Sequence, residues 1–338
     1  MKKTLLVSAI ASALSLVGCQ STTGTTPTKP ESTSHISQNV YEVEYNAAQA
    51  FLAQTGELER SFADYCALET KEDTQVKQQW HQTMLAWMAL QGQERGPEAA
   101  LAQSWNIQFW PDKKNTTGRK MSSLIKQPKA WTQQDIALQS VTVQGLGSIE
   151  WLLYDKASNL TGNPQTCETA QAISSNIELN AGKIAQAWVM NPWVGLDEKQ
   201  WESEYIALLS NQLEYSMKKM SRPLANFGKP RPYFTESWRS ETSMQNLKAN
   251  VEAMQALYFA NGKGLDALLR EKGKATLADS ISNQFAMTVE TWPSDESLFD
   301  MLQTKQGYQK AYSQYNKLEQ LKYLIHEEVA IELGVIIG

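Results

Sequence analysis

A single carboxylate, that of Glu150, interrupts an otherwise uncharged stretch of the 338-residue chain. From Ile136 to Tyr154 the sequence runs through aliphatic side chains, serine, threonine, glutamine and two glycines, and only Glu150 is charged. A helix that is apolar on nearly all sides is a buried helix. A carboxylate inside it must be paired with a cation, bound to a metal ion or protonated. Glu150 is therefore the first candidate for ligand or metal binding.

Two glycines, Gly145 and Gly147, stand just before this carboxylate. If the helix holds through the segment, Gly147 lies one turn before Glu150 and on the same side. The carboxylate then faces a notch in the helix surface. That notch could receive a neighbouring helix or a ligand, and close helix packing is the simpler interpretation.

Two further stretches combine aromatic and ionisable side chains at breaks in the helical pattern. Trp110 and Asp112 flank a proline, and the segment 236–240 reads Glu-Ser-Trp-Arg-Ser. Arg239 is a natural partner for a buried carboxylate, because its planar guanidinium group matches a carboxylate bidentately. An ion pair between Arg239 and some other acid is the plain structural alternative. Ser240 could cap the helix that follows. With Glu236, Ser237 and Trp238, these residues form the second candidate cluster.

Familiar catalytic motifs do not account for these residues. A zinc-protease helix needs two histidines four residues apart, and His326-Glu327-Glu328 has no second histidine. Serine nucleophile elbows, phosphate-binding loops and dinucleotide fingerprints are absent from the sequence. The net charge of −5 without a basic cluster argues against a nucleic-acid partner.

The elements that must position the candidate residues are predicted to be helices. Apolar residues recur at helical spacing along most of the chain, as at Val76, Trp80, Met84 and Trp87. The long apolar stretch around Glu150 is predicted to be one helix. No segment alternates with period two for long enough to require a sheet. We therefore predict an all-α fold.

Helices of this length joined by short loops suggest two packed up-and-down helical bundles. The segment Ser221–Phe234 holds three prolines and a glycine and is not expected to be regular helix. We place the boundary there, with an N-terminal bundle over residues 37–220 and a C-terminal bundle over residues 221–338.

The N-terminus carries a targeting signal rather than part of the fold. Lys2 and Lys3 precede a short apolar segment, and the residues Leu-Val-Gly-Cys at 16–19 resemble the lipobox of bacterial lipoproteins. The pattern predicts a signal peptide over 1–18, lipidation of Cys19 and a flexible Ser/Thr/Pro-rich tether over 19–36. Gln20 after the cysteine favours the outer membrane over inner-membrane retention. A cleaved secretory signal without lipid is the alternative.

Apart from Cys19, the chain holds two cysteines, Cys66 and Cys167, and the predicted signal peptide would place them in an oxidising compartment. Two such cysteines most simply form a disulfide. A bridge that closes a loop of about 100 residues would stabilise the fold by roughly 4–5 kcal/mol in the chain-entropy model. Two buried free thiols are the competing interpretation.

Together these stretches resemble the imelysin family of bacterial periplasmic and outer-membrane proteins, also catalogued as a peptidase family. The family motif, Gly-x-His-x-x-Glu on a helix, corresponds here to residues 145–150, Gly-Leu-Gly-Ser-Ile-Glu. The segments at 109–112, 151–154 and 236–240 also look like the family, and the resemblance spans about 40–338. It implies two helical-bundle domains of duplicated origin, with the motif near the cleft between them. The family histidine position is Gly147, so a His–Glu metal pair does not carry over.

The resemblance implies a role in iron acquisition. Glu150 and Asp112, together with Glu236, could supply oxygen ligands to a hard cation such as ferric iron, and Trp110 and Trp238 could wall a small iron chelate. The first hypothesis is a non-enzymatic binding or accessory lipoprotein of the iron-uptake machinery. The alternatives are a structural or interaction lipoprotein without a small ligand, and a metallopeptidase, which the missing histidine disfavours.

Overall fold

The computed structural model describes residues 33–68 and 72–336. Over these ranges the chain folds into helices without a β-strand, and the only bridge is an isolated one between Asn226 and Lys229. The prediction of an all-α fold is confirmed. The predicted signal peptide, Cys19 and the tether as far as residue 32 lie outside the described residues.

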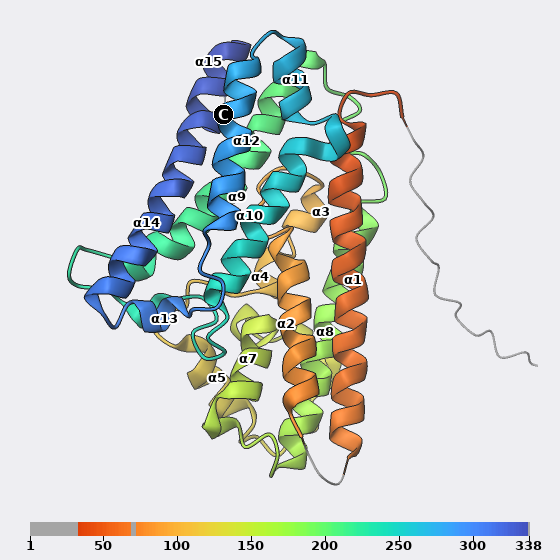
Figure 1. The fold of residues 1–338 in the computed structure, drawn as a ribbon. Helices are drawn as coiled ribbons and strands as arrows, with labels where there is room; N and C mark the ends of the chain where they lie inside the picture. The colour runs from red at the N-terminus through yellow and green to blue at the C-terminus, as the bar shows by residue number, and fades with distance from the viewer. Residues whose placement is uncertain (1–32, 69–71, 337–338) are drawn as a thin grey trace, which may run out of the picture.

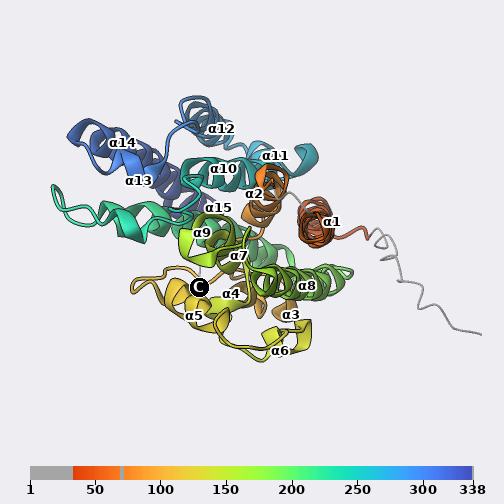
Figure 2. The same cartoon turned by 90° about the horizontal axis from the view of Figure 1, so that it is seen from below.

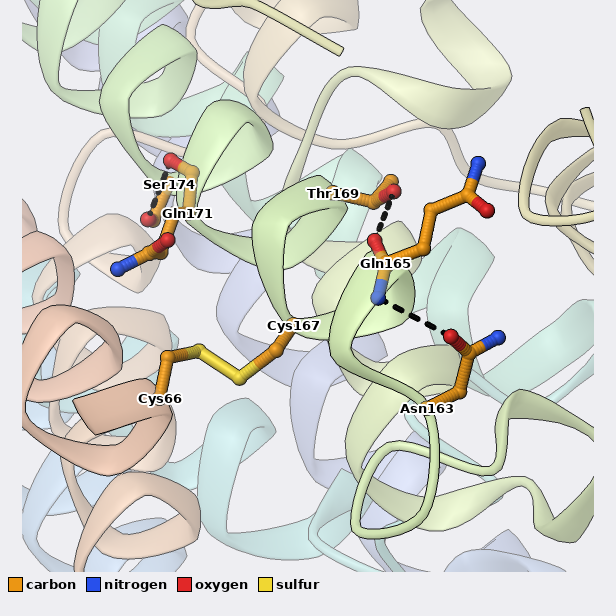
Figure 3. Close-up of a disulfide and its surroundings, with 7 residues drawn as sticks. All are labelled: Cys66, Asn163, Gln165, Cys167, Thr169, Gln171 and Ser174. Atoms are coloured by element: carbon orange, nitrogen blue, oxygen red, sulfur yellow. Dashed lines mark hydrogen bonds between the residues drawn. A yellow bond between two sulfur atoms is a disulfide. The ribbon is translucent and has the colours of Figure 1, made fainter. Parts of the chain in front are cut away.

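Three long helices pack side by side in the first group of elements, namely α1 (Gln38–Ala67), α2 (Thr74–Met88) and α8 (Pro164–Ala187). α1 contacts both α2 and α8 along much of its length (Figure 1). Its apolar stripe, including Phe51, Leu58 and Phe62, is fully buried. The predicted disulfide between Cys66 and Cys167 is present and joins the end of α1 to the start of α8 (Figure 3).

The second group is built on α9 (Glu198–Leu224), which packs against α10 (Ser243–Phe259) and α14 (Lys305–Lys322). Shorter helices complete it: α11 (Leu265–Glu271), α12 (Ala275–Glu290), α13 (Leu298–Met301) and α15 (Val329–Leu333). A π-helical segment, Tyr323–Glu328, connects α14 to α15, so the helical backbone continues from Lys305 to Leu333. α10 also contacts α2, which joins the two groups.

The helix α9 continues past the predicted domain boundary at residue 221. Residues 221–224, which the sequence analysis expected to be irregular, form its last turn, with Pro223 inside the helix. The proline is tolerated there because the helix ends one residue later, so its missing N–H interrupts the ladder only at its end. The division into bundles at this point stays a prediction.

Short helices form the connection between α2 and α8 and carry the candidate site. They are α3 (Glu98–Leu101), α4 (Ser104–Ile107), α5 (Thr116–Leu124), α6 (Gln133–Ala137) and α7 (Leu146–Tyr154). Figure 1 shows α5 and α7 at the end of the molecule opposite α11 and α15. In Figure 2, seen from below, α5 and α6 lie along one side and α12 and α14 along the other, with α7 between them.

The prediction of one long helix around Glu150 was wrong. α6 ends at Ala137, a 3₁₀ turn covers Val141–Val143, and α7 begins only after Gly145. Gly145 adopts an extended conformation because the backbone of residues 106–107 crosses it, and a Cβ there would lie 2.2 Å from the carbonyl oxygen of Ile107. This tertiary approach outweighs the local apolar pattern.

None of the helices in the described ranges combines the length and the apolar character needed to cross a membrane.

Candidate functional site

A pocket of about 270 Å³ opens beside α7, and most of the predicted site residues line it. The pocket combines a wall from α7, a wall from the chain before α5 and a wall from the connection between α9 and α10. The predicted residues in its lining are Trp110, Asp112, Gly147, Glu150, Glu236, Ser237, Trp238 and Arg239. Gly145 and Ser240 do not line it. Residues more than 120 positions apart in the sequence thus meet at one site.

The two glycines before Glu150 have different roles. A Cβ added to Gly147 would meet no atom within 4 Å, so this position faces open space in the pocket wall. Gly147 lies three residues before Glu150 in α7, as the sequence predicts. Close packing, the simpler interpretation of the notch, therefore applies to Gly145 and not to Gly147. The notch at Gly147 belongs to the pocket.

Glu150 is buried, with only 5% of its surface exposed, and one of its oxygens is saturated by donors. Oε1 accepts hydrogen bonds from the backbone N–H groups of Arg239 and Ser240 and from the hydroxyl of Ser240, each at 3.0 Å. Burial raises the pKa of Glu150, and the donors from Ser240 and the nearby charge of Arg239 oppose that rise. Glu150 thus links the α9–α10 connection to α7 through hydrogen bonds.

The guanidinium group of Arg239 does not pair with Glu150, so that predicted interaction was wrong. Its Nε lies 3.2 Å from Oδ2 of Asp155, its Nη2 donates to Oδ1 of Asn115 at 2.8 Å, and the group lies 4.2 Å from the ring centre of Trp238. The alternative of an ion pair with another acid is the one that the structure contains. The sequence could not distinguish them, because Asp155 is only five residues from Glu150.

Glu236 is paired with a buried cation that no sequence pattern indicates. Its Oε2 lies 2.6 Å from Nζ of Lys219 on α9, and both side chains are almost fully buried. Its Oε1 accepts from the side-chain amides of Gln91 at 2.6 Å and Gln108 at 3.0 Å. Lys219 also donates to Asn250 on α10 at 2.8 Å. This network ties the pocket wall to both groups of helices.

Asp112 acts as a cap for α5. Its Oδ1 accepts from the backbone N–H of Thr116 at 2.6 Å, and its Oδ2 accepts from that of Thr117 at 2.8 Å. A carboxylate near a helix N-terminus is also favoured by the helix dipole. Both oxygens therefore already have donors, which would compete with a metal ion.

The described carboxylates around the pocket do not form a cluster of three metal ligands. Across residues 33–68 and 72–336, no three His, Cys, Asp or Glu side chains gather in an arrangement able to hold one. Glu150 and Asp112 line the same pocket, but position 147 offers no side chain and Glu236 is paired with Lys219. Ligation of a metal by Glu150 and Asp112 stays a prediction.

Aromatic rings form the rest of the pocket wall. The ring of Trp238 packs edge-on against Tyr233 at 5.0 Å between ring centres and stacks on Phe299 of α13 at 5.8 Å. On the opposite wall, Nε1 of Trp110 donates to the carbonyl oxygen of Phe234 at 3.2 Å. These contacts hold both indoles in place, so the apolar walls are preformed.

The two serines of the 236–240 segment shape its backbone. Ser237 has a positive φ of 52°, a conformation uncommon for residues other than glycine. Its hydroxyl accepts from Asn246 at 3.1 Å, and its carbonyl oxygen accepts from the hydroxyl of Ser240 at 3.1 Å. Ser240 does not cap the following helix, because α10 begins at Ser243 with Thr242 at its N-cap. Ser240 instead donates to Glu150 from its backbone N–H and its hydroxyl, and the hydroxyl also bonds to the carbonyl oxygen of Ser237.

Several lining residues were missed by the sequence analysis, namely Gln108, Phe109, Lys113, Lys114, Asn115, Thr117, Tyr233, Phe234 and Thr235. Lys113 and Lys114 directly follow Asp112, so their nearness to the site could have been inferred from chain continuity. Gln108 carries no charge and stands in no recognisable motif. Its place between two pocket walls follows only from the packing.

Comparison with known proteins gives a consistent result. The family model described as Imelysin (Peptidase_M75) matches residues 44–325. A crystal structure of an imelysin-like protein from Psychrobacter arcticum 273-4 is similar with a TM-score of 0.74 and 18% identity, over 90% of this chain and 95% of that chain. An iron-regulated protein A precursor from Parabacteroides distasonis ATCC 8503 is similar with a TM-score of 0.64 and 15% identity, over 88% and 95%. No curated protein matches the sequence.

Proposed function

The chain belongs to the imelysin family, and from that premise we propose that it is a non-enzymatic binding protein that takes up an iron chelate in the pocket beside α7. The observation that carries this proposal is the convergence of the predicted residues on one preformed pocket, with Glu150 at its base and two tryptophans in its walls. A structural relative is described as iron-regulated, which supports iron as the cargo.

The geometry favours a chelate over a bare ferric ion. Asp112 caps a helix, Glu236 is paired with Lys219 and Oε1 of Glu150 has three donors. A bare ion would have to displace these partners to gain the oxygen ligands that it requires. A chelate brings its own ligands and needs only walls and a few polar contacts. The same argument disfavours a metallopeptidase, which needs protein ligands around an activated water.

We also propose that the protein is anchored to the outer membrane through lipid on Cys19 and works with the iron-uptake machinery. The lipobox-like residues 16–19 and Gln20 support this location. A structural or interaction lipoprotein is the second candidate, because the hydrogen bonds of Glu150 with Arg239 and Ser240 would equally serve to hold the fold together.

The deciding experiment is thermal unfolding of the purified protein with ferric iron and with ferric chelates of different kinds. A ligand that binds only the native state stabilises it, by about 2.7 kcal/mol when its concentration is a hundred times its Kd. We expect stabilisation by at least one chelate, and its loss in Trp238→Ala. Trp105→Ala, which removes an exposed tryptophan outside the pocket, is the matched control and should retain the effect.

No stabilisation by any ferric species in the wild-type protein would contradict the proposal and favour the structural alternative.

A further inference from the structure

The pocket beside α7 is lined by equal numbers of acidic and basic side chains, but these differ in whether the protein already supplies them with a partner. Three are carboxylates, on Asp112, Glu150 and Glu236, and each already accepts hydrogen bonds from within the protein. Glu236 is in addition neutralised by buried Lys219, which does not line the pocket. The negative charge of the pocket is therefore largely committed to holding the fold.

Of the three basic side chains that line the pocket, one has partners within the described part of the protein and two do not. Arg239 is engaged with Asp155 and Asn115 and lies over Trp238. Lys113 and Lys114 are exposed at the pocket mouth, and neither makes an ion pair or a hydrogen bond with the part of the chain that the structure describes. The charge left without a partner at the mouth is thus positive and comes from two adjacent lysines.

We infer that the ligand of this pocket is a small anionic polycarboxylate, which carries iron as its chelate and meets Lys113 and Lys114 with its free carboxylate oxygens. The inference rests on the proposed function and specifies its ligand. An ammonium group close to a carboxylate forms a charge-assisted hydrogen bond. The volume of about 270 Å³ is near the lower end of the range for small-molecule pockets, which suits an acid of citrate size.

The walls are consistent with a ligand of this class. The rings of Trp110 and Trp238 give apolar faces for a carbon skeleton, and the hydroxyl of Ser237 and the side chain of Thr117 add neutral polar contacts among the lining residues. A cationic ligand would have to approach past the two lysines, which repel it over the roughly 8 Å screening length at physiological salt. The pocket therefore selects by charge at its mouth.

The test is calorimetric titration of the wild-type protein with three probes: citrate alone, ferric citrate, and a cationic ferric hydroxamate chelate. We expect both citrate probes to bind and the cationic chelate to bind at least tenfold more weakly. The variant Lys113→Ala/Lys114→Ala should lose about tenfold or more in affinity for the citrate probes, as expected for lost hydrogen bonds to charged groups. Lys113→Arg/Lys114→Arg, which keeps the charge, should retain most of it.

Lys120→Ala is the matched control, because Lys120 is an exposed lysine of α5 that does not line the pocket. Its affinity for citrate should be unchanged.

The outcomes separate this inference from the proposed function. Binding of citrate with no preference for its ferric form would support the anionic pocket and contradict the iron role. Binding of the cationic ferric chelate with equal or higher affinity, unaffected by the lysine variants, would support the iron role and overturn the inference. No binding of any probe would overturn both.

Discussion

Glu150 shows how a residue can join two distant segments without an ion pair. Its Oε1 accepts hydrogen bonds from the backbone N–H groups of Arg239 and Ser240 and from the hydroxyl of Ser240. A carboxylate that accepts several donors in the interior is stabilised by them, although its burial opposes ionisation. The residue therefore defines the shape of the pocket as well as its charge, and the conformation of Ser237 is part of the same arrangement.

At the same scale, Gly145, which precedes α7, and Gly147, which lies within it, should respond in opposite ways to substitution by alanine. Gly147→Ala adds a methyl group in open space within a helix, where alanine is favoured over glycine by about 0.8–1 kcal/mol. Gly145→Ala places a methyl group 2.2 Å from a carbonyl oxygen and forces the backbone apart, at a cost of about 1–3 kcal/mol. Denaturant unfolding of both variants measures the difference. Equal effects would show that the packing at Gly145 is not as described.

A third residue, Glu44 on α1, makes the stability dependent on pH. Burial raises its pKa to about 8, against the opposing effect of the Gln93 amide, which donates to both oxygens at 2.7 Å. The unfolded chain loses this proton near pH 4.5, whereas the native protein retains it to about pH 8. Stability from this group is therefore greatest below about pH 4.5, falls as the pH rises towards 8, and then levels off.

We expect Glu44→Gln to flatten this part of the pH profile, with a difference of several kcal/mol across the window. The measurement is the free energy of unfolding between pH 5 and pH 9. Glu57→Gln, at an exposed position on the same helix, is the control and should leave the profile unchanged. A wild-type profile that does not decline relative to Glu44→Gln would contradict the assignment.

At the scale of elements, the pair formed by Lys219 and Glu236 connects α9 to the pocket wall. Because both groups are buried, removal of either alone leaves an uncompensated charge. We predict that Lys219→Met or Glu236→Gln destabilises the protein by about 3–5 kcal/mol, and that the double variant recovers a large part of the loss. Chemical denaturation of the three variants measures this coupling.

The surface pair of Lys310 with Glu296 supplies the control for that cycle. Lys310→Ala should change stability by no more than about 1 kcal/mol, because exposed ion pairs contribute little. Additive losses in the buried double variant would mean that Lys219 and Glu236 do not interact as described.

For the whole molecule, the sequence predicts the class of the fold and singles out segments that line one pocket, but it does not predict their contacts. Helical stripes such as Val76, Trp80 and Met84 become buried faces, because periodicity reflects packing directly. Cys66 and Cys167 form the disulfide that the sequence predicts. The segments around Trp110, Glu150 and Trp238 do meet at one pocket.

The sequence does not predict which side chains pair with each charged residue. Lys219 reads as one more surface lysine in a helix, and only the packing of α9 against α10 places it beside Glu236. The sequence offers several acids as partners for the guanidinium group of Arg239, and only the folded structure shows that the partner is Asp155. The break between α6 and α7 depends on a crossing by residues 106–107, which no local pattern reveals.

Glu150 and the residues that donate to it are far apart in the sequence, so their contacts form late during synthesis. A chain is synthesised from its N-terminus, so Glu150 leaves the ribosome 89 residues before Arg239 and 90 residues before Ser240. Contacts between such distant segments form only after the entropy of closing the intervening loop has been overcome. The nascent chain thus has no complete pocket until residues 239 and 240 have been synthesised.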